Sequence, residues 1–322
     1  MRSIRLPGSG CFEATYPIAA WEEVPCVTGP PIPFIPAHGL PPGVVGNGTD
    51  FMAKVPTGIT RSDGYFPKVT GLASETDSLI GNNSFTFQLN TQVFQNAATA
   101  ALCVGAEYPS ECSGWQQFVF ANTSYSNYTS AILMQYWLIN YGANQCPHNW
   151  NAFGGDCYTN SPMTGINTTI INAMDNLMLS GAWLPGNPQS DEVYLDTSPV
   201  GAGATHIHAI NSPSIFDLGA NGNWTQAEFN VFGYSNGSEA NFNAGTTALV
   251  QLVTYTGLGP LSPVPGMCWP YGTTGETSNL SLVGGCCPAI TGVSFTESNQ
   301  AGATAKFCPA VFQSVMEIIQ DN

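Results

Sequence analysis

Positive charge and long apolar runs are both scarce in this sequence. Six Lys and Arg residues stand against 21 Asp and Glu, which gives a formal net charge of −15 and a pI of about 4.2. A chain this acidic repels nucleic-acid phosphates and anionic membranes, so we expect no nucleic-acid partner. No run of about 18 consecutive apolar residues occurs, and we therefore expect no membrane span.

Charged residues of either sign are also few, at 8% of the chain, whereas hydrophobic residues make up 43%. Disordered chains combine low hydrophobicity with high charge, so this composition indicates a folded chain with a substantial core. Its polar surface has to come mainly from Asn, Ser, Thr, Gln and Gly. The excess of carboxylates, whose mutual repulsion fades on protonation, favours a working environment below neutral pH.

The ten cysteines lack the spacing of a zinc site, and their even number favours disulfides in an oxidising compartment. Three pairs are close enough in sequence to close local loops, namely Cys11/Cys26, Cys103/Cys112 and Cys146/Cys157. The remaining four, Cys268, Cys286, Cys287 and Cys308, then pair among themselves in an order that the sequence leaves open.

Eight Asn-x-Ser/Thr sequons join the disulfides in indicating a eukaryotic secretory route and a glycosylated surface. The acceptor residues are Asn47, Asn82, Asn122, Asn127, Asn167, Asn223, Asn236 and Asn279. We therefore predict a secreted, extracellular protein. Residues 1–7 lack the apolar run of a signal peptide, so we expect either a mature form or a shortened gene product.

Proline and glycine dominate residues 1–70, where segments such as Gly-Pro-Pro-Ile-Pro at 29–33 fit neither helices nor central strands. We predict an extended arm, tied down by Cys11 and Cys26 and packed on one main domain at 71–322. In that domain, apolar and polar residues alternate over 85–93 and 227–232, as in half-buried strands.

Further strands are predicted at 117–120, 247–253 and 293–296, and residues 131–139 are apolar on both faces, as in a covered central strand. Helical patterns are few: one face over 170–178 and a terminal segment at 310–319. Many short strands separated by Asn-Gly and Gly-rich turns predict an all-β sandwich or jelly roll.

Two polar residues on these strands are candidates for chemistry. Gln135 is the one polar side chain inside the apolar run 131–139, and Glu228 lies on the polar face of 227–232. As a carboxylate, Glu228 can activate water as a general base, and the Gln135 amide can donate to the developing oxyanion. The alternative interpretation makes Gln135 a satisfied buried amide and Glu228 a surface acid.

The segments around both residues resemble the catalytic strands of the fungal glutamic peptidases, the eqolisins. Ser-Ala-Ile-Leu-Met-Gln at 130–135 and Ala-Glu-Phe at 227–229 are similar to that family's Ala-Ile-Leu-Gln and Ala-Glu-Phe, in the same order. The segment 288–297 resembles the one that follows the family's catalytic Glu. The resemblance implies a concanavalin A-like β-sandwich and an acid endopeptidase, with a polypeptide substrate, no cofactor, and catalytic Glu228 and Gln135.

Two departures accompany the resemblance. Met134 is one residue more than the family motif has before its Gln, which turns Gln135 to the opposite face of its strand. A related plant-type family uses two Glu residues, and here Glu297 or Glu276 could be the second. Longer segments, such as 135–141, resemble secreted bacterial and fungal proteins, a likeness that implies no activity.

His206 and His208 lie on one face of a predicted strand with a spacing that suits a metal. The sequence shows no third ligand, although Asp191, Glu192 and Asp196 are near, so we predict no metal site. Most of the aromatic residues are expected in the core, while two or three exposed on one sheet face would form a sugar-binding platform.

We therefore predict a secreted acid endopeptidase acting through Glu228 and Gln135. The alternative is a non-catalytic secreted glycoprotein that binds extracellular glycans or forms a cell-surface or extracellular assembly. The two are distinguished by whether Glu228 and Gln135 face each other across a polar cleft. The oligomeric state stays open.

Overall fold

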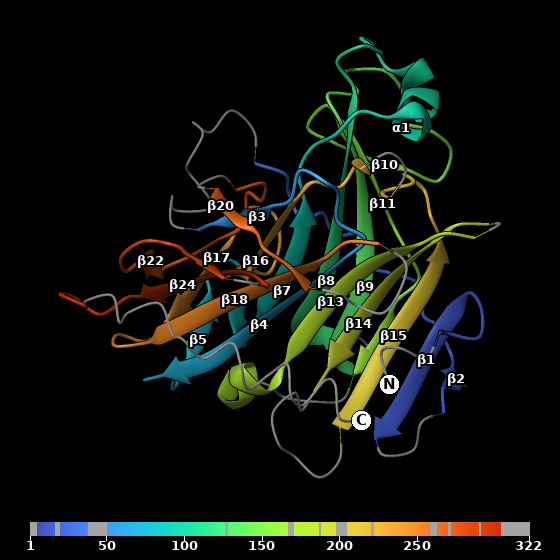
Figure 1. The fold of residues 1–322 in the computed structure, drawn as a ribbon. Helices are drawn as coiled ribbons and strands as arrows, with labels where there is room; N and C mark the ends of the chain where they lie inside the picture. Colours follow the sequence, from blue (N-terminus) through green and yellow to red (C-terminus); the bar gives the residue numbers. More distant parts are fainter. Residues whose placement is uncertain are drawn as a thin grey trace.

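The computed structural model shows a chain built almost wholly of β-strands (Figure 1). It describes residues 5–16, 20–37, 50–125, 128–166, 171–186, 188–197, 205–219, 222–257, 263–269, 272–289 and 291–303. No helix within these ranges is long and apolar enough to cross a membrane. Two large antiparallel sheets and one small sheet make up the molecule, an arrangement consistent with a β-sandwich.

The larger sheet joins strands from both ends of the chain, and in Figure 1 the blue β1 lies beside the yellow β15. In order across this sheet, its described strands are β2 (Glu22–Val24), β1 (Gly10–Tyr16), β15 (Thr205–Pro213), β14 (Ser190–Asp196), β13 (Met178–Leu184), β4 (Arg61–Thr70), β18 (Thr247–Tyr255), β24 (Gly292–Ser298) and β22 (Ser281–Leu282). Two short strands pair at its side, β19 (Pro263–Val264) with β18 and β23 (Cys287–Ala289) with β24.

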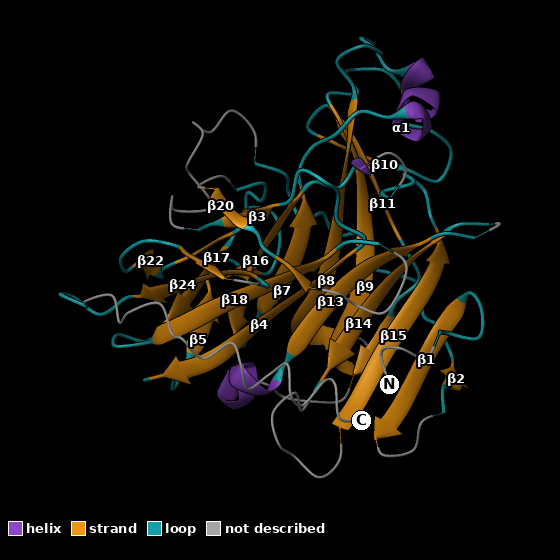
Figure 2. Cartoon of the chain, viewed as in Figure 1, coloured by secondary structure: helices purple, strands orange, loops and turns teal. Residues whose placement is uncertain are grey.

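The second sheet contains the strands that carry the candidate residues. Its described strands run β10 (Asn151–Phe153), β11 (Asp156–Asn160), β9 (Tyr128–Ile139), β8 (Ser113–Tyr125), β7 (Phe85–Thr91), β16 (Gln226–Gly233), β3 (Met52–Lys54) and β20 (Met267–Trp269), with β12 (Thr164–Ile166) paired to β9. The small sheet is β21 (Thr277–Ser278), β17 (Glu239–Phe242), β5 (Glu75–Asp77) and β6 (Gly81–Asn82). Figure 2 shows how little helix accompanies these strands.

Alternate residues of the strands form the core between the two large sheets. On β7, Phe85, Phe87 and Leu89 point into this core, and on β16 Phe229 and Val231 do so. Burying one such side chain stabilises the fold by about 2–3 kcal/mol. The period of two predicted at 85–93 and 227–232 is therefore the period of the core face.

Two glycines of the larger sheet let aromatic rings approach from the opposite sheet. A Cβ atom on Gly64 of β4 would lie 2.1 Å from the ring of Phe229, and one on Gly181 of β13 would lie 2.4 Å from the ring of Phe118. Any side chain at these positions would push the sheets apart. The inter-sheet packing therefore depends on strand glycines as well as on large apolar residues.

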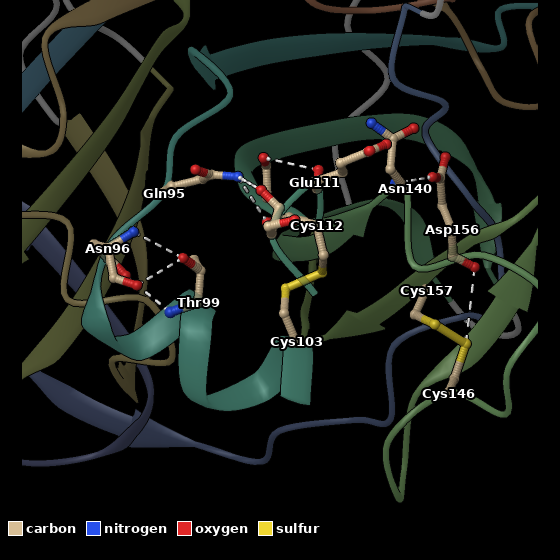
Figure 3. The surroundings of a disulfide bond; sticks show 12 residues. Gln95, Asn96, Thr99, Cys103, Glu111, Cys112, Asn140, Cys146, Asp156 and Cys157 are labelled. Carbon is tan, nitrogen blue, oxygen red and sulfur yellow. Dashed lines mark hydrogen bonds between the residues drawn. A yellow bond between two sulfur atoms is a disulfide. The ribbon is translucent and has the colours of Figure 1, made fainter. Parts of the chain in front are cut away.

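The short helix α1 (Ala97–Leu102) begins at Asn96, whose side chain accepts from the backbone N–H of Thr99 in a capping box. The 3-10 turn η1 (Cys103–Gly105) follows, and Cys103 is bonded to Cys112 (Figure 3). The nearby disulfide Cys146–Cys157 joins the loop before β10 to β11. These two bonds hold together the end of the molecule that projects at the top of Figure 1.

All three predicted local disulfides are confirmed. Cys11–Cys26, Cys103–Cys112 and Cys146–Cys157 are present, and Cys268 pairs with Cys286. Cys308 and the side chain of Cys287 lie outside the described residues. Four disulfides are typical of a protein that folds in an oxidising compartment.

Several sequence predictions differ from the structure. Strands β7 and β16 are buried on both faces, so the prediction of half-buried strands at 85–93 and 227–232 is wrong. The helix expected over 170–178 is a 3-10 turn, η2 (Ile171–Asn176), after which Met178 begins β13. Residues 1–70 supply β1 to β4 to the two large sheets, and β4 is a central strand. The terminal helix expected at 310–319 lies outside the described residues.

Candidate functional site

Gln135 and Glu228 lie in a single row of polar side chains across the nine-stranded sheet. Gln135 of β9 is opposite Gln117 of β8, Gln117 is opposite Asn90 of β7, and Asn90 is opposite Glu228 of β16. The apolar neighbours of these residues along each strand face the inter-sheet core, so the row lies on the outer face. Each of the four residues is 0% exposed.

Side-chain hydrogen bonds link the members of this row. Trp137 Nε1 donates to the Oε1 atoms of both Gln135 and Gln117, at 2.9 and 3.0 Å. Gln117 Nε2 donates to Gln88 Oε1 at 2.8 Å, and Asn90 Nδ2 donates to the same oxygen at 3.4 Å. Asn90 Nδ2 also donates to Glu228 Oε2 at 3.0 Å. A continuous polar layer therefore runs from Gln135 to Glu228.

The two predicted catalytic residues share a face but are not in contact. Three strand spacings separate them, which corresponds to about 14 Å between their Cα atoms. Neither faces an open cleft, because each is fully buried under another part of the chain. The structure thus brings Gln135 and Glu228 onto one polar surface and keeps them apart on it.

Glu228 is instead surrounded by other acids. Asp50 and Glu297 are both buried, and Asn230 Nδ2 donates to Asp50 Oδ2 at 3.0 Å and to Glu297 Oε1 at 2.8 Å. The charges of Glu228 and Glu297 both act on Asp50. Three carboxyl groups from β16, β24 and the residue preceding Phe51 therefore converge at one end of the row, and we call them the acid cluster.

Burial raises the pKa of every member of the acid cluster. Desolvation is the main cause for Asp50, whose pKa is raised further by the charges of Glu228 and Glu297. Desolvation also raises the pKa of Glu228, although hydrogen bonds from Thr273 and Asn90 oppose it. Burial likewise raises the pKa of Glu297, against the hydrogen bond from Asn230. Like charges this close disfavour joint ionisation, so the cluster holds protons well above the pH at which a free carboxyl loses its own.

Residues 272–276 cover Glu228. The backbone N–H of Thr273 donates to Oε1 and Oε2 of Glu228, at 3.2 and 3.1 Å, and the Thr273 hydroxyl donates to Oε2. The next residue, Thr274, donates from Oγ1 to Glu276 Oε2 at 2.8 Å. Glu276 is fully buried, and desolvation raises its pKa to about 7. Both oxygens of Glu228 are thus occupied by protein donors.

Residues 30–37 cover the other end of the row, and we call this segment the strap. Gln135 Nε2 donates to the carbonyl of Ile32 at 2.8 Å, and Gln135 Oε1 accepts from the N–H of Phe34 at 2.7 Å. The N–H of Ile35 donates to Glu276 Oε1 at 2.7 Å. Both halves of the Gln135 amide are therefore engaged with the backbone of the strap.

The two histidines of β15 have protein partners on β1. His206 Nδ1 lies 3.1 Å from Thr15 Oγ1, and His208 Nδ1 lies 3.1 Å from Glu13 Oε1. Desolvation lowers the pKa of His208, against the attraction of Glu13. In the part of the chain that the structure describes, no group of three or more His, Cys, Asp and Glu side chains could hold a metal ion.

The sequon asparagines differ in accessibility. Asn82 and Asn236 are exposed, Asn223 and Asn279 are partly buried, and Asn122 is 3% exposed. The Asn122 amide donates to the carbonyl of Asn83, so a glycan there would have to displace packed chain. Asn47, Asn127 and Asn167 lie outside the described residues.

Most residues of the polar layer were not singled out in the sequence. Asp50, Gln88, Asn90, Gln117 and Asn230 occupy the polar positions of loops or alternating strands. Such positions normally face water, and the strap and residues 272–276 turn this face into an interior. Four amide side chains at polar positions of three neighbouring strands, together with Asp50 just before β3, were the sequence signal that could have located the layer.

Comparisons of the chain with protein-family models, with curated proteins and with solved structures returned no match. The functional argument therefore depends on the site itself.

Proposed function

We propose that the chain is a secreted, glycosylated, acid-active endopeptidase of the glutamic type, on a jelly-roll sandwich of the concanavalin A kind. The convergence of Glu228, Asp50 and Glu297 in one buried cluster carries the proposal. Carboxyl groups whose pKa is raised can exchange protons with a substrate in mildly acidic solution. The disulfides and the acidic pI support a secreted protein that works at low pH.

In this proposal Glu228 acts as the general base, because the hydrogen bond from Asn90 favours the ionised form of this member of the acid cluster. Its carboxylate takes a proton from a water molecule, whose oxygen attacks the carbonyl carbon of the peptide bond. The proton then passes to the leaving nitrogen as the C–N bond breaks. Glu297, held protonated beside Asn230, donates a hydrogen bond to the oxyanion. This proposal therefore uses two Glu residues in place of the Glu and Gln pair. For a substrate to reach Glu228, residues 272–276 have to move away from its oxygens.

Gln135 fits a different role from that of oxyanion donor in this arrangement. Its amide already binds a carbonyl and an N–H of extended backbone, two residues apart in the strap. A substrate backbone offers the same groups. Gln135 therefore binds peptide at a distance of three strands from the base. A direct Gln135–Glu228 pair would require the two ends of the row to approach each other.

A second candidate is a non-catalytic secreted glycoprotein that binds glycans or forms an extracellular assembly. The saturation of the two candidate residues favours it, since each oxygen of Glu228 and both polar atoms of the Gln135 amide have protein partners. Exposed Trp269 on β20, 4.3 Å from Lys54 Nζ, offers one aromatic ring for a sugar.

Cleavage of a denatured protein substrate between about pH 2 and 7 tests the proposal, with wild type beside Glu228→Gln, Glu297→Gln and Gln135→Ala. Glu192→Gln is the matched control, because Glu192 is also a buried Glu but lies on β14 of the other large sheet. We expect acid-only cleavage that Glu228→Gln abolishes and that Glu297→Gln lowers by about 100-fold.

The other outcomes separate the alternatives. An equal loss in Gln135→Ala, with Glu297→Gln active, would restore the Gln/Glu pair. Absence of cleavage by folded wild type at every pH would refute the endopeptidase and favour the binding protein, to be followed by glycan arrays.

A further inference from the structure

The strap is held in two ways. Its second half pairs with residues 273–275, where the N–H of Ala37 donates to the carbonyl of Thr273 and the carbonyl of Ile35 accepts from the N–H of Gly275. Its first half contains prolines at 30, 31 and 33, which have no N–H to donate, so this half cannot pair as an ordinary strand and is held mainly by side chains. Backbone carbonyls of such a segment remain free to accept. Proline-rich segments of this kind are recognised elsewhere by grooves that offer aromatic rings and hydrogen-bond donors.

Three consecutive carbonyls of the strap each receive a donor from the nine-stranded sheet. Asn160 Nδ2 donates to Pro30 O at 2.6 Å, and Tyr158 Oη donates to Pro31 O at 3.0 Å. Gln135 Nε2 donates to Ile32 O at 2.8 Å. Asn160 and Tyr158 come from β11 and Gln135 from the adjacent β9. The three donors thus lie together on two neighbouring strands beneath the strap, with Asn160 directly opposite Gln135.

An apolar pocket completes the contact. The side chain of Phe34 is 0% exposed and packs in a cluster with Val119, Leu133 and Tyr234, with its ring edge-on to the Tyr234 ring at 6.4 Å. The N–H of Phe34 is the group bound by Gln135 Oε1. The surface therefore binds three consecutive main-chain carbonyls and, two residues after the last of them, an aromatic side chain.

We infer that this surface, formed by Gln135, Tyr158, Asn160 and the Phe34 pocket, is a receptor groove for an extended proline-rich peptide, and that the strap is its resident ligand. Every polar contact to residues 30–34 is made to the main chain, so a separate chain of similar composition can make the same contacts. The inference concerns binding alone and holds whether or not Glu228 is catalytic.

The test uses the full chain and a fluorescein-labelled peptide with the sequence of residues 28–37, followed by fluorescence anisotropy. Phe34→Ala removes the strap side chain that fills the apolar pocket. The substitution weakens the resident strap and leaves the groove residues unchanged. In wild type the strap competes with added peptide, so the apparent affinity for the peptide is reduced to the fraction of molecules in which the groove is open. Phe34→Ala raises that fraction, and we expect it to bind the peptide at least about tenfold more tightly than wild type.

Two controls show where the peptide binds. A peptide with Ala in place of its Phe should lose at least about tenfold in affinity, since the pocket stays empty. Adding Tyr158→Phe to Phe34→Ala removes one hydroxyl donor and should weaken binding about three- to tenfold. Tyr108→Phe, at a residue that is 58% exposed, is the matched control and should leave binding unchanged.

The inference is overturned if folded Phe34→Ala binds the labelled peptide no better than wild type, or if the Ala peptide binds equally well. Should Phe34→Ala fail to fold, hydrogen exchange of wild type decides. Excess unlabelled peptide must then speed exchange at the N–H groups of Phe34 and Ile35 several-fold by displacing the strap, and unchanged exchange refutes the groove.

Discussion

Glu276 should make the protein more stable in acid than at slightly alkaline pH. Its carboxyl is fully buried beneath the strap, and desolvation raises its pKa from 4.5 to about 7. The folded state therefore holds the proton more tightly than the unfolded chain does. The resulting stabilisation is complete below the unfolded pKa and is lost as the pH rises through about 7.

The size of the effect follows from the shift. At about 1.4 kcal/mol for each pH unit, the free energy of unfolding should fall by about 3 kcal/mol between pH 4.5 and pH 8 because of Glu276 alone. Glu276→Gln removes this titration and keeps a neutral amide in place of the protonated acid. The variant should resemble wild type at pH 4.5 and exceed its stability by up to about 3 kcal/mol at pH 8.

Urea unfolding followed by tryptophan fluorescence measures this difference, because Trp115, Trp137 and Trp224 are fully buried. Glu23→Gln, at an exposed position of the edge strand β2, controls for loss of one negative charge. A stability difference between wild type and Glu276→Gln that is independent of pH, or that grows toward acid, would refute the reasoning.

Two further predictions concern packing and cross-linking. Gly64→Ala should destabilise the fold by about 2 kcal/mol or more, because its Cβ would overlap the ring of Phe229, whereas Gly285→Ala, with open space around it, should cost far less; urea midpoints of the two variants decide. Replacing Cys103 and Cys112 by Ser should lower the free energy of unfolding by about 3 kcal/mol, because the disulfide restricts the short loop in the unfolded chain. The difference between the variant and wild type should disappear when both are measured under reducing conditions.

The strands were predictable because each has a core face. Alternation over 85–93 and 227–232 locates β7 and β16, and the apolar run at 131–139, interrupted only by Gln135, locates β9. Close spacing along the chain likewise predicted the three local disulfides. These features depend on residues near in sequence, which a local pattern can report.

The acid cluster and the strap contacts were not predictable in the same way. Gln88 and Asn90 have the pattern of a solvent-facing strand side, and nothing local shows that residues 30–37 and 272–276 cover them. The strap contacts join residues about a hundred positions apart, as between Phe34 and Gln135. Asp50 and Glu297 come from distant parts of the sequence and are brought together by their shared partner Asn230. Long-range arrangement decides which polar residues become interior.

The strap is synthesised well before the strands that form its groove, and this order affects when the strap can bind. Residues 30–36 leave the ribosome about a hundred residues before Gln135, and β11 follows later still. The strap therefore has no binding surface while the first third of the chain is being made. Until β9 and β11 are paired, its carbonyls stay hydrated and its Phe34 side chain stays exposed to solvent and to chaperones. Docking of the strap is a late event in folding, and a nascent chain stalled before residue 160 would leave it accessible to protease.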